Sequence, residues 1–142
     1  MDKLEVGDKV PDVFHDFIQL SDKKVVLYFY PKDNTPGCTQ EACNLRDNYL
    51  VLVEKGYEVY GVSPDTEKSH QSFSQKYSLP FKLIADPEKK LILGFNAWGE
   101  KKMYGKSYEG ILRKTFVIGS DGNILKIIDK VDTKDHTSQI LD

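Results

Sequence analysis

The feature that most constrains this chain is the run Val25–Tyr30, VVLYFY, in which every residue is apolar, β-branched or aromatic. A run of this length and composition predicts a buried central strand, because a strand with one face in water would alternate apolar and polar residues. Pro31 ends the run, since proline cannot continue a sheet ladder. The sequence therefore predicts the centre of a sheet here, followed by the turn-rich stretch KDNTPG.

Strands and helices alternate along the rest of the chain. Apolar residues at three- and four-residue spacing predict one helix from Cys38 to Lys55, with Gly56 as its C-cap. Beyond it we expect a strand, a helix that begins at Ser63-Pro64, a short strand, a short helix, a loop, a hairpin and a short terminal helix. Their ranges are 57–62, 63–77, 81–85, 87–93, 94–110, 115–128 and 136 onward.

This order predicts an α/β fold in a single domain over residues 1–142. Alternation implies a central sheet with helices on both faces, and the closing hairpin adds an antiparallel edge, so the sheet is mixed. The expected architecture is a thioredoxin-like, three-layer α/β/α sandwich. Its active site should lie where the first central strand runs into the N-terminus of the first helix.

Charge and cysteine usage narrow the function. The formal net charge of −2 gives no basic field for nucleic acid or an anionic membrane. The N-terminus has no apolar signal-peptide core, and no stretch approaches the ~20 apolar residues of a membrane span, so we expect a cytoplasmic protein. It has two cysteines, five positions apart. In a reducing compartment such a pair is more typical of catalysis or metal binding than of a structural disulfide.

The surroundings of Cys38 favour a reactive thiolate. Thr35 is a good N-cap residue and Pro36 a favoured first helical residue, which places Cys38 in the first helical turn. Free backbone N–H groups and the positive end of the helix dipole favour the thiolate there. Gly37 leaves room beside the sulfur for a small substrate. A buried structural cysteine is the alternative, but such a cysteine rarely follows a Thr-Pro-Gly turn.

Cys43 cannot bond to Cys38 while the helix is intact. Five residues of ideal helix rotate by about 140° and rise by about 7.5 Å, which places the two Cα atoms roughly 8–9 Å apart. A disulfide needs less than about 7 Å. If the two cysteines pair, the first helical turns must unwind, which predicts a folded reduced site and a locally unfolded oxidised one. Cys43 as a plain core residue is the alternative.

Other kinds of site fit the sequence less well. Zinc usually requires four clustered ligands, whereas His15, His70 and His136 are scattered and are expected at the surface. Papain-type Cys/His catalysis stays open on sequence distance alone, but it leaves Cys43 without a role. A redox sensor that uses a disulfide switch is a second hypothesis. A thioredoxin-type disulfide oxidoreductase is a third, although that chemistry normally uses Cys-x-x-Cys.

The string YFYPKDNTPGCTQEACNLRDN at residues 28–48 resembles the active-site segment of the peroxiredoxins. Pro31, Thr35 and Cys38 match the motif Pro-x-x-x-Thr/Ser-x-x-Cys. Cys43 matches the second cysteine of the Q-type branch, also called bacterioferritin comigratory protein. Similar segments at 61–65, 83–87, 98–118 and 130–136 extend the resemblance over nearly the whole chain.

The resemblance implies a thiol peroxidase that reduces hydrogen peroxide and organic hydroperoxides. Cys38 would be the peroxidatic cysteine, and its thiolate would attack the peroxide to give a sulfenic acid. Cys43 would resolve this acid as an intramolecular disulfide. Arg113, in ILRKTF at 111–116, matches the catalytic arginine of the family and would stabilise the thiolate and the leaving oxygen.

Three further residues take roles from the same resemblance. Thr35 would hydrogen-bond the peroxide, with simple N-capping as the alternative. Pro31 would shield the thiolate from water, and Glu41 would orient charged neighbours or, alternatively, complement the helix dipole. Thioredoxin, or a similar dithiol protein, would reduce the disulfide, and no metal or organic cofactor would be needed. An intrachain disulfide needs no partner subunit, so we expect a monomer.

The chain departs from the family at one place. Family members usually carry a longer stretch, with a β-hairpin, before the central strand. Residues 11–24, PDVFHDFIQLSDKK, are several residues short and contain no glycine. This departure puts the N-terminal hairpin in question, but not the catalytic residues.

Overall fold

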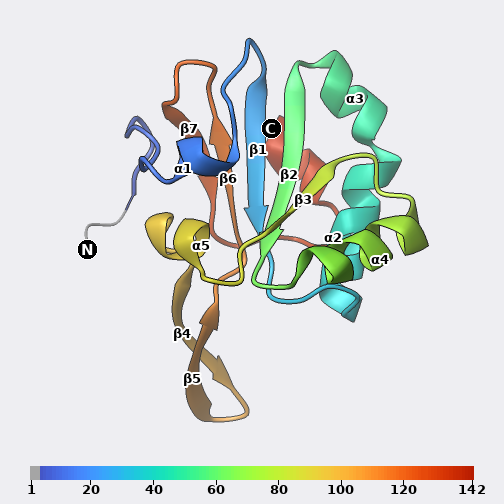
Figure 1. Ribbon diagram of the computed structural model, residues 1–142, viewed down its shortest axis with the longest axis vertical. Helices are drawn as coiled ribbons and strands as arrows, with labels where there is room; N and C mark the ends of the chain where they lie inside the picture. The colour runs from blue at the N-terminus through green and yellow to red at the C-terminus, as the bar shows by residue number, and fades with distance from the viewer. Residues whose placement is uncertain (1–3) are drawn as a thin grey trace.

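A computed structural model describes residues 4–142 of the chain. Thirteen elements follow one another along it (Figure 1). The helices are α1 (Phe14–Phe17), α2 (Pro36–Asp47), α3 (Tyr49–Glu54), α4 (Glu67–Tyr77), α5 (Lys90–Gly94) and α6 (His136–Leu141). The strands are β1 (Lys24–Phe29), β2 (Tyr57–Ser63), β3 (Lys82–Ala85), β4 (Trp98–Met103), β5 (Lys106–Ile111), β6 (Lys114–Ile118) and β7 (Ile124–Ile128).

The predicted mixed sheet is confirmed. Its strand order is β3-β2-β1-β6-β7, with β1 in the middle. β1 and β3 run parallel to β2, whereas β6 runs antiparallel to both β1 and β7. The hairpin expected over 115–128 is β6–β7, at the antiparallel edge of the sheet.

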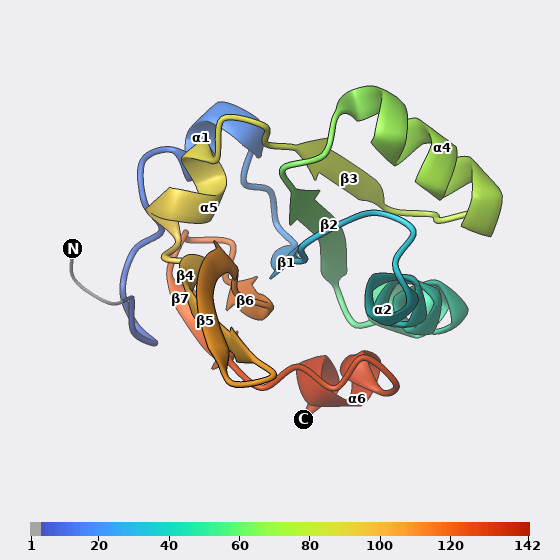
Figure 2. The same cartoon turned by 90° about the horizontal axis from the view of Figure 1, so that it is seen from below.

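β1 is buried on both faces, as its apolar sequence predicts. Val25, Leu27 and Phe29 lie in a core with α1 and α5, whereas Val26 and Tyr28 lie in a second core with α2, α3, α4 and α6. Figure 2 shows the sheet between these two helical layers. The α/β thioredoxin-like fold class is thus confirmed, and the N-terminus of α2 follows the end of β1 after a short loop.

The predicted helix over 38–55 is wrong in its extent. Two helices, α2 and α3, meet at Asn48, whose backbone leaves the helical region with φ −112° and ψ 14°. The Asn48 side chain donates to the Asn44 carbonyl oxygen at 2.8 Å. This local bond competes with the helical backbone pattern, as asparagine side chains commonly do.

Two more boundaries differ from the predictions. α4 begins at Glu67 rather than Ser63, because Ser63 still belongs to β2 and the Thr66 hydroxyl caps the helix by accepting from Ser69 N at 3.1 Å. The predicted loop over 94–110 is wrong, since most of it forms the β4–β5 hairpin, which projects from the body (Figure 1). Before β1, the described residues contain α1 and no hairpin.

Candidate active site

Cys38 lies in the first turn of α2, as predicted. The Cys38 side chain is buried, and both cysteines are free thiols. α2 is continuous from Pro36 to Asp47, so the helix between Cys38 and Cys43 is intact. The ideal-helix separation of roughly 8–9 Å between their Cα atoms therefore applies, beyond disulfide reach.

Arg113 reaches Cys38 across 75 positions of sequence. It lies between β5 and β6, and its Nη2 donates to Cys38 Sγ at 3.4 Å. The same guanidinium donates through Nη1 to Glu41 Oε1 at 2.8 Å. A planar guanidinium carries several donors in fixed directions, so it can serve a sulfur and a carboxylate together. The positive charge of Arg113 therefore lies against the Cys38 sulfur.

Gly37 gives Arg113 the space to approach. A Cβ atom built at Gly37 would lie 3.3 Å from Arg113 Nη2. We expected this glycine to admit substrate to the backbone; in the structure, the guanidinium faces the missing side chain. The absence of a side chain at Gly37 therefore allows the Arg113 guanidinium to approach the Cys38 sulfur.

Glu41 is completely buried beneath Arg113, with 0% of its surface exposed. Burial raises the pKa of Glu41 to about 7, although the nearby Arg113 charge and hydrogen bond act in the opposite direction. Burial also lowers the pKa of Arg113, but the charges of Cys38 and Glu41 outweigh this effect and the net shift is upward. Glu41 thus contacts Arg113 directly and is not in the exposed first turn that a dipole partner would occupy.

Thr35 occupies the N-cap position of α2, but its side chain does not cap the helix. Its hydroxyl donates to the Lys32 carbonyl oxygen at 2.9 Å. The proton is used in that bond, so the lone pairs of Oγ1 remain to accept a hydrogen bond. Pro31 follows directly after β1 and Tyr30 and is partly buried.

Two histidines expected at the surface are buried, and sequence reasoning missed both. His136 has 0% of its surface exposed, and its Nε2 lies 2.8 Å from Thr115 Oγ1 and 3.5 Å from Glu41 Oε2. Only His15 is exposed, as predicted. A buried histidine gives no local pattern in a sequence; the available sign was that His136 ends the segment 130–136, which resembles the peroxiredoxin family.

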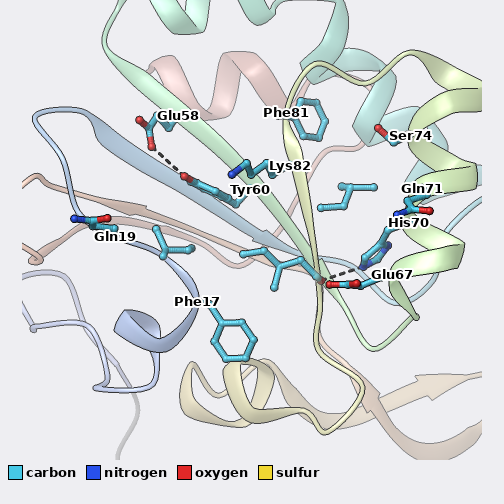
Figure 3. A pocket seen from close by; sticks show the side chains of 13 residues that line it. Phe17, Gln19, Glu58, Tyr60, Glu67, His70, Gln71, Ser74, Phe81 and Lys82 are labelled. Carbon is cyan, nitrogen blue, oxygen red and sulfur yellow. Dashed lines mark hydrogen bonds between the residues drawn. The ribbon is translucent and has the colours of Figure 1, made fainter.

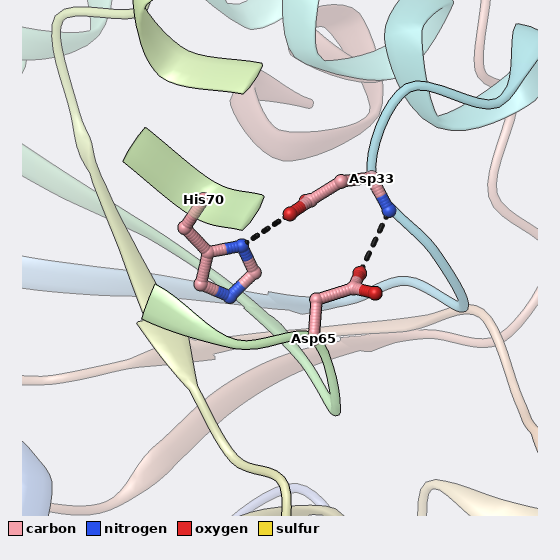
Figure 4. A group of neighbouring side chains, drawn as sticks. All are labelled: Asp33, Asp65 and His70. Carbon is pink, nitrogen blue, oxygen red and sulfur yellow. Dashed lines mark hydrogen bonds and ion pairs between the residues drawn. The ribbon is translucent and has the colours of Figure 1, made fainter. Parts of the chain in front are cut away.

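His70 forms a second buried cluster, which holds the loop before α2 (Figure 4). Its Nδ1 lies 2.7 Å from Asp33 Oδ2, and its Nε2 lies 3.0 Å from the Ile84 carbonyl oxygen. Both ring nitrogens thus face acceptors, which requires the imidazolium form. Asp65 accepts from Asp33 N at 2.8 Å, and Ser69 donates to Asp33 Oδ2 at 2.8 Å.

The charges of this cluster shift both pKa values. Burial lowers the pKa of His70, but the hydrogen bond and the charge of Asp33 outweigh burial and the net shift is upward. Burial raises the pKa of Asp33, but hydrogen bonds from His70, Tyr30 and Ser69 outweigh it and the net shift is downward. The His70 ring and the Asp33 carboxylate bind each other directly. We therefore interpret them as a buried ion pair that anchors the loop before α2.

A groove of about 720 Å³ lies along β3, and His70 is one of its lining residues (Figure 3). Phe17, Tyr60 and Phe81 line it together with Lys82. Neither Cys38 nor Arg113 is among its lining residues. A smaller cavity of about 460 Å³ does include Arg113, with the other lining residues Lys101, Leu112, Lys114, Asp129, Lys130 and Val131. Arg113 therefore contacts the buried Cys38 and also lines this second, cationic cavity.

None of the helices described for residues 4–142 could span a membrane.

Comparison with known proteins gives one family throughout. The model of the AhpC/TSA family matches residues 7–127. Peroxiredoxin Bcp of Bacillus subtilis is 44% identical over 97% of this chain and 93% of its own length. A putative peroxiredoxin of Haemophilus influenzae is 43% identical, over 100% of this chain and 97% of its own.

Solved structures agree with the sequence matches. A cysteine-to-serine variant of Xylella fastidiosa PrxQ matches with a TM-score of 0.87 and 30% identity, over 99% of this chain and 95% of that one. The bacterioferritin comigratory protein of Xanthomonas campestris matches with a TM-score of 0.79 and 36% identity, over 85% and 77%. That structure is described in terms of the alkyl peroxide reduction activity of the Xanthomonas protein.

Proposed function

The chain belongs to the AhpC/TSA family of peroxiredoxins and is a thiol peroxidase. We propose that Cys38 is its peroxidatic cysteine and that Cys43 is its resolving cysteine. The contact of 3.4 Å between Arg113 Nη2 and Cys38 Sγ carries the proposal. It joins a thiol at a helix N-terminus to a fixed positive charge, the setting that makes a cysteine nucleophilic.

The first step is attack of the Cys38 thiolate on one peroxide oxygen. An S–O bond forms, the O–O bond breaks, and the leaving oxygen takes up a proton to give water or an alcohol. Arg113 stabilises the negative charge that moves onto the leaving oxygen. Thr35 accepts a hydrogen bond from the peroxide O–H, because its own proton already binds the Lys32 carbonyl oxygen.

Pro31 and Glu41 support this step without reacting. Pro31 follows the buried end of β1 and shields the sulfur from water. Glu41 holds the second arm of the Arg113 guanidinium at 2.8 Å and so fixes the direction of the arm that reaches Cys38. Both are positioning roles.

The second step is attack of Cys43 on the Cys38 sulfenic acid, which releases water and forms a disulfide. The first turns of α2 must unwind for this step, since the intact helix keeps the cysteines apart. A dithiol protein of the thioredoxin type then reduces the exposed disulfide by exchange. We further propose that the residues 1–142 act as a single domain and a monomer, in the cytoplasm, where such reductants operate.

Peroxide consumption coupled to NADPH, thioredoxin reductase and thioredoxin tests this function. We expect turnover for the wild type, none for Cys38→Ser, and for Cys43→Ser a single turnover or a requirement for an added small thiol. If Cys38 is oxidised once but the wild type does not turn over with any dithiol reductant, the chain is a redox sensor and not a peroxidase.

A further inference from the structure

One carboxylate oxygen of Glu41 has no hydrogen-bond donor. Arg113 binds Oε1, whereas Oε2 is buried and makes no hydrogen bond to any described residue. His136 Nε2 lies 3.5 Å from this oxygen. A buried, ionised oxygen without a donor is costly, so a proton between Glu41 and His136 would relieve the site.

The tautomer of His136 leaves its Nε2 available for that proton. Gln139 Nε2 donates to the Lys130 carbonyl oxygen at 2.8 Å, and Asp132 N donates to Gln139 Oε1 at 2.8 Å. These two bonds fix the amide, so the atom that lies 2.8 Å from His136 Nδ1 is the amide oxygen. An amide oxygen only accepts, so Nδ1 carries a hydrogen and Nε2 faces the inner side of the site.

Thr115 is compatible with either protonation state of Nε2. Its hydroxyl lies 2.8 Å from His136 Nε2 and is buried. A hydroxyl donates to a neutral nitrogen and accepts from a protonated one simply by rotating. The bond to Thr115 is therefore kept whether Nε2 or Glu41 Oε2 holds the proton, and His136 acts on Glu41 across 3.5 Å through its charge rather than through a second hydrogen bond.

We propose that His136 is a positioning residue of the peroxidase, which shares one proton with Glu41 and thereby leaves the negative charge of the buried site on Cys38. The inference rests on the proposed role of Cys38. Arg113 is a single cation between two acidic groups. When the pair holds the proton, the pair is neutral and the Arg113 charge acts on the thiolate alone.

The proton balance closes without a further reactant. The Cys38 thiol gives its proton to the Glu41–His136 pair, so the net charge of the buried group does not change. When the thiolate is converted to a sulfenic acid, the negative charge departs with the leaving oxygen, which takes up overall the one proton that the pair received from the thiol. The pair then loses its anionic neighbour, and release of its proton is favoured.

The charged and titratable surroundings are consistent with a shared proton near neutral pH. Burial raises the pKa of Glu41 to about 7, and burial lowers the pKa of His136. Five titratable or charged groups act electrostatically on the pair or on its neighbours Arg113 and Cys38. They lie in β1, α2, β4, the segment before β6 and the loop before α6. They are Tyr28, Cys38, Lys101, Arg113 and Asp132.

A double-mutant cycle with a pH profile separates this role from mere packing. Glutamine at position 136 keeps a donor but takes up no proton, so His136→Gln removes one of the two proton sites of the pair and favours a negative charge on Glu41. We expect the pH profile of Cys38 oxidation by hydrogen peroxide to move up by about one pH unit, with an about tenfold lower rate constant on its rising limb. In a Glu41→Gln background, His136→Gln should not move the midpoint. An equal shift in both backgrounds would show that His136 acts only through packing.

Nitrogen NMR of the imidazole tests the same coupling without peroxide or a substitution at the pair. In the reduced wild type we expect Nδ1 of His136 to stay protonated and Nε2 to titrate at a higher pH than in Cys38→Ser, which has no thiolate. Identical titrations would overturn the shared proton even if the enzyme turns over. A coupled titration in a protein without turnover would instead contradict the proposed function alone.

Discussion

At the scale of single residues, the proposed chemistry depends on how the guanidinium of Arg113 is held. Arg113 spans Cys38 and Glu41 with two different nitrogens, 3.4 Å and 2.8 Å from their acceptors. A lysine ammonium is a compact point charge and cannot span both acceptors in fixed directions. The arginine therefore supplies geometry as well as charge.

Arg113→Lys should lower the rate constant of Cys38 oxidation by about 10²–10³-fold, the range found when one preorganised donor is lost. Stopped-flow mixing of reduced protein with hydrogen peroxide measures it. Arg46→Lys is the matched control, because Arg46 lies near the other end of α2 and donates to the Tyr77 carbonyl oxygen. Similar losses in both variants would mean that the effect is a general weakening of the helix.

Gly37→Ala should lower the same rate constant by about tenfold or less. The added Cβ would lie 3.3 Å from Arg113 Nη2, so the guanidinium must move by a few tenths of an ångström. Small displacements of a catalytic group are costly in rate. In the Arg113→Lys background, Gly37→Ala should lower the rate constant little further. An equal loss in both backgrounds would mean that the alanine perturbs the start of α2 and does not act through Arg113.

Local sequence signals located part of this site. Thr35, Pro36 and Cys38 follow from N-cap chemistry, and the resemblance supplied Arg113 and Glu41. The contact between Gly37 and Arg113 and the burial of His136 depend on tertiary packing between segments that are many residues apart. No periodicity or cap in the sequence records such contacts.

At the scale of elements, α2 is anchored unevenly along its length. Its C-terminal half is tied down by Asn44, which accepts from Thr137 N at 2.9 Å and donates to the Lys134 carbonyl oxygen at 3.0 Å. Its N-terminal half depends on the pair of Glu41 and Arg113 and on an exposed bond between Thr133 and Gln40. Unwinding for a disulfide should therefore stop before Asn44.

Hydrogen exchange of the oxidised protein should show this limit. With the disulfide formed, the amides of residues 39–43 should lose protection by about tenfold or more, while those of residues 45–47 keep theirs. Peroxide-treated Cys43→Ser, which forms no intramolecular disulfide, is the control and should keep the N-terminal half protected. Loss of protection along the whole of α2 would refute a limited unwinding.

Element types were more predictable than element limits. The β4–β5 hairpin was missed because its strands, rich in lysine and glycine, show no apolar alternation. The signal was the two-residue turn at Tyr104-Gly105, where both residues have positive φ, 53° and 78°. Such a turn favours a hairpin, but tyrosine is an unusual residue in it.

At the scale of the whole molecule, the buried pair of Asp33 and His70 joins the loop before α2 to α4. The ion pair is 2.7 Å long, and both side chains are almost fully buried. The strand order and the two cores follow from the apolar β1 and the alternation of elements. The ion pair between Asp33 and His70 does not follow from these features, because it depends on which loop packs against which helix.

His70→Ala should lower the free energy of unfolding by about 3–5 kcal/mol, because it leaves the Asp33 carboxylate buried without its partner. Urea denaturation measures the change. His15→Ala is the control and should have almost no effect, because His15 is exposed. A loss of similar size at His15, or none at His70, would contradict the anchoring role.

The same pair should make stability depend on pH in a defined direction. The raised pKa of folded His70 gives stability that is full below its ordinary value of 6.5 and is lost as the pH rises through the folded value. The lowered pKa of folded Asp33 gives stability that is full above its ordinary value of 3.8 and is lost as the pH falls through the folded value. The stability difference between wild type and His70→Ala should therefore be greatest between these values and should shrink at alkaline pH. A difference that grows as the pH is raised would contradict the charged pair.

The most direct test of the chemistry is to oxidise the reduced protein with one equivalent of hydrogen peroxide and to map the product by mass spectrometry. We predict a disulfide between Cys38 and Cys43 in the wild type, a sulfenic acid on Cys38 in Cys43→Ser, and no rapid oxidation in Cys38→Ser. Rapid oxidation of Cys43 in Cys38→Ser, or of neither cysteine in the wild type, would contradict Cys38 as the residue that attacks the peroxide.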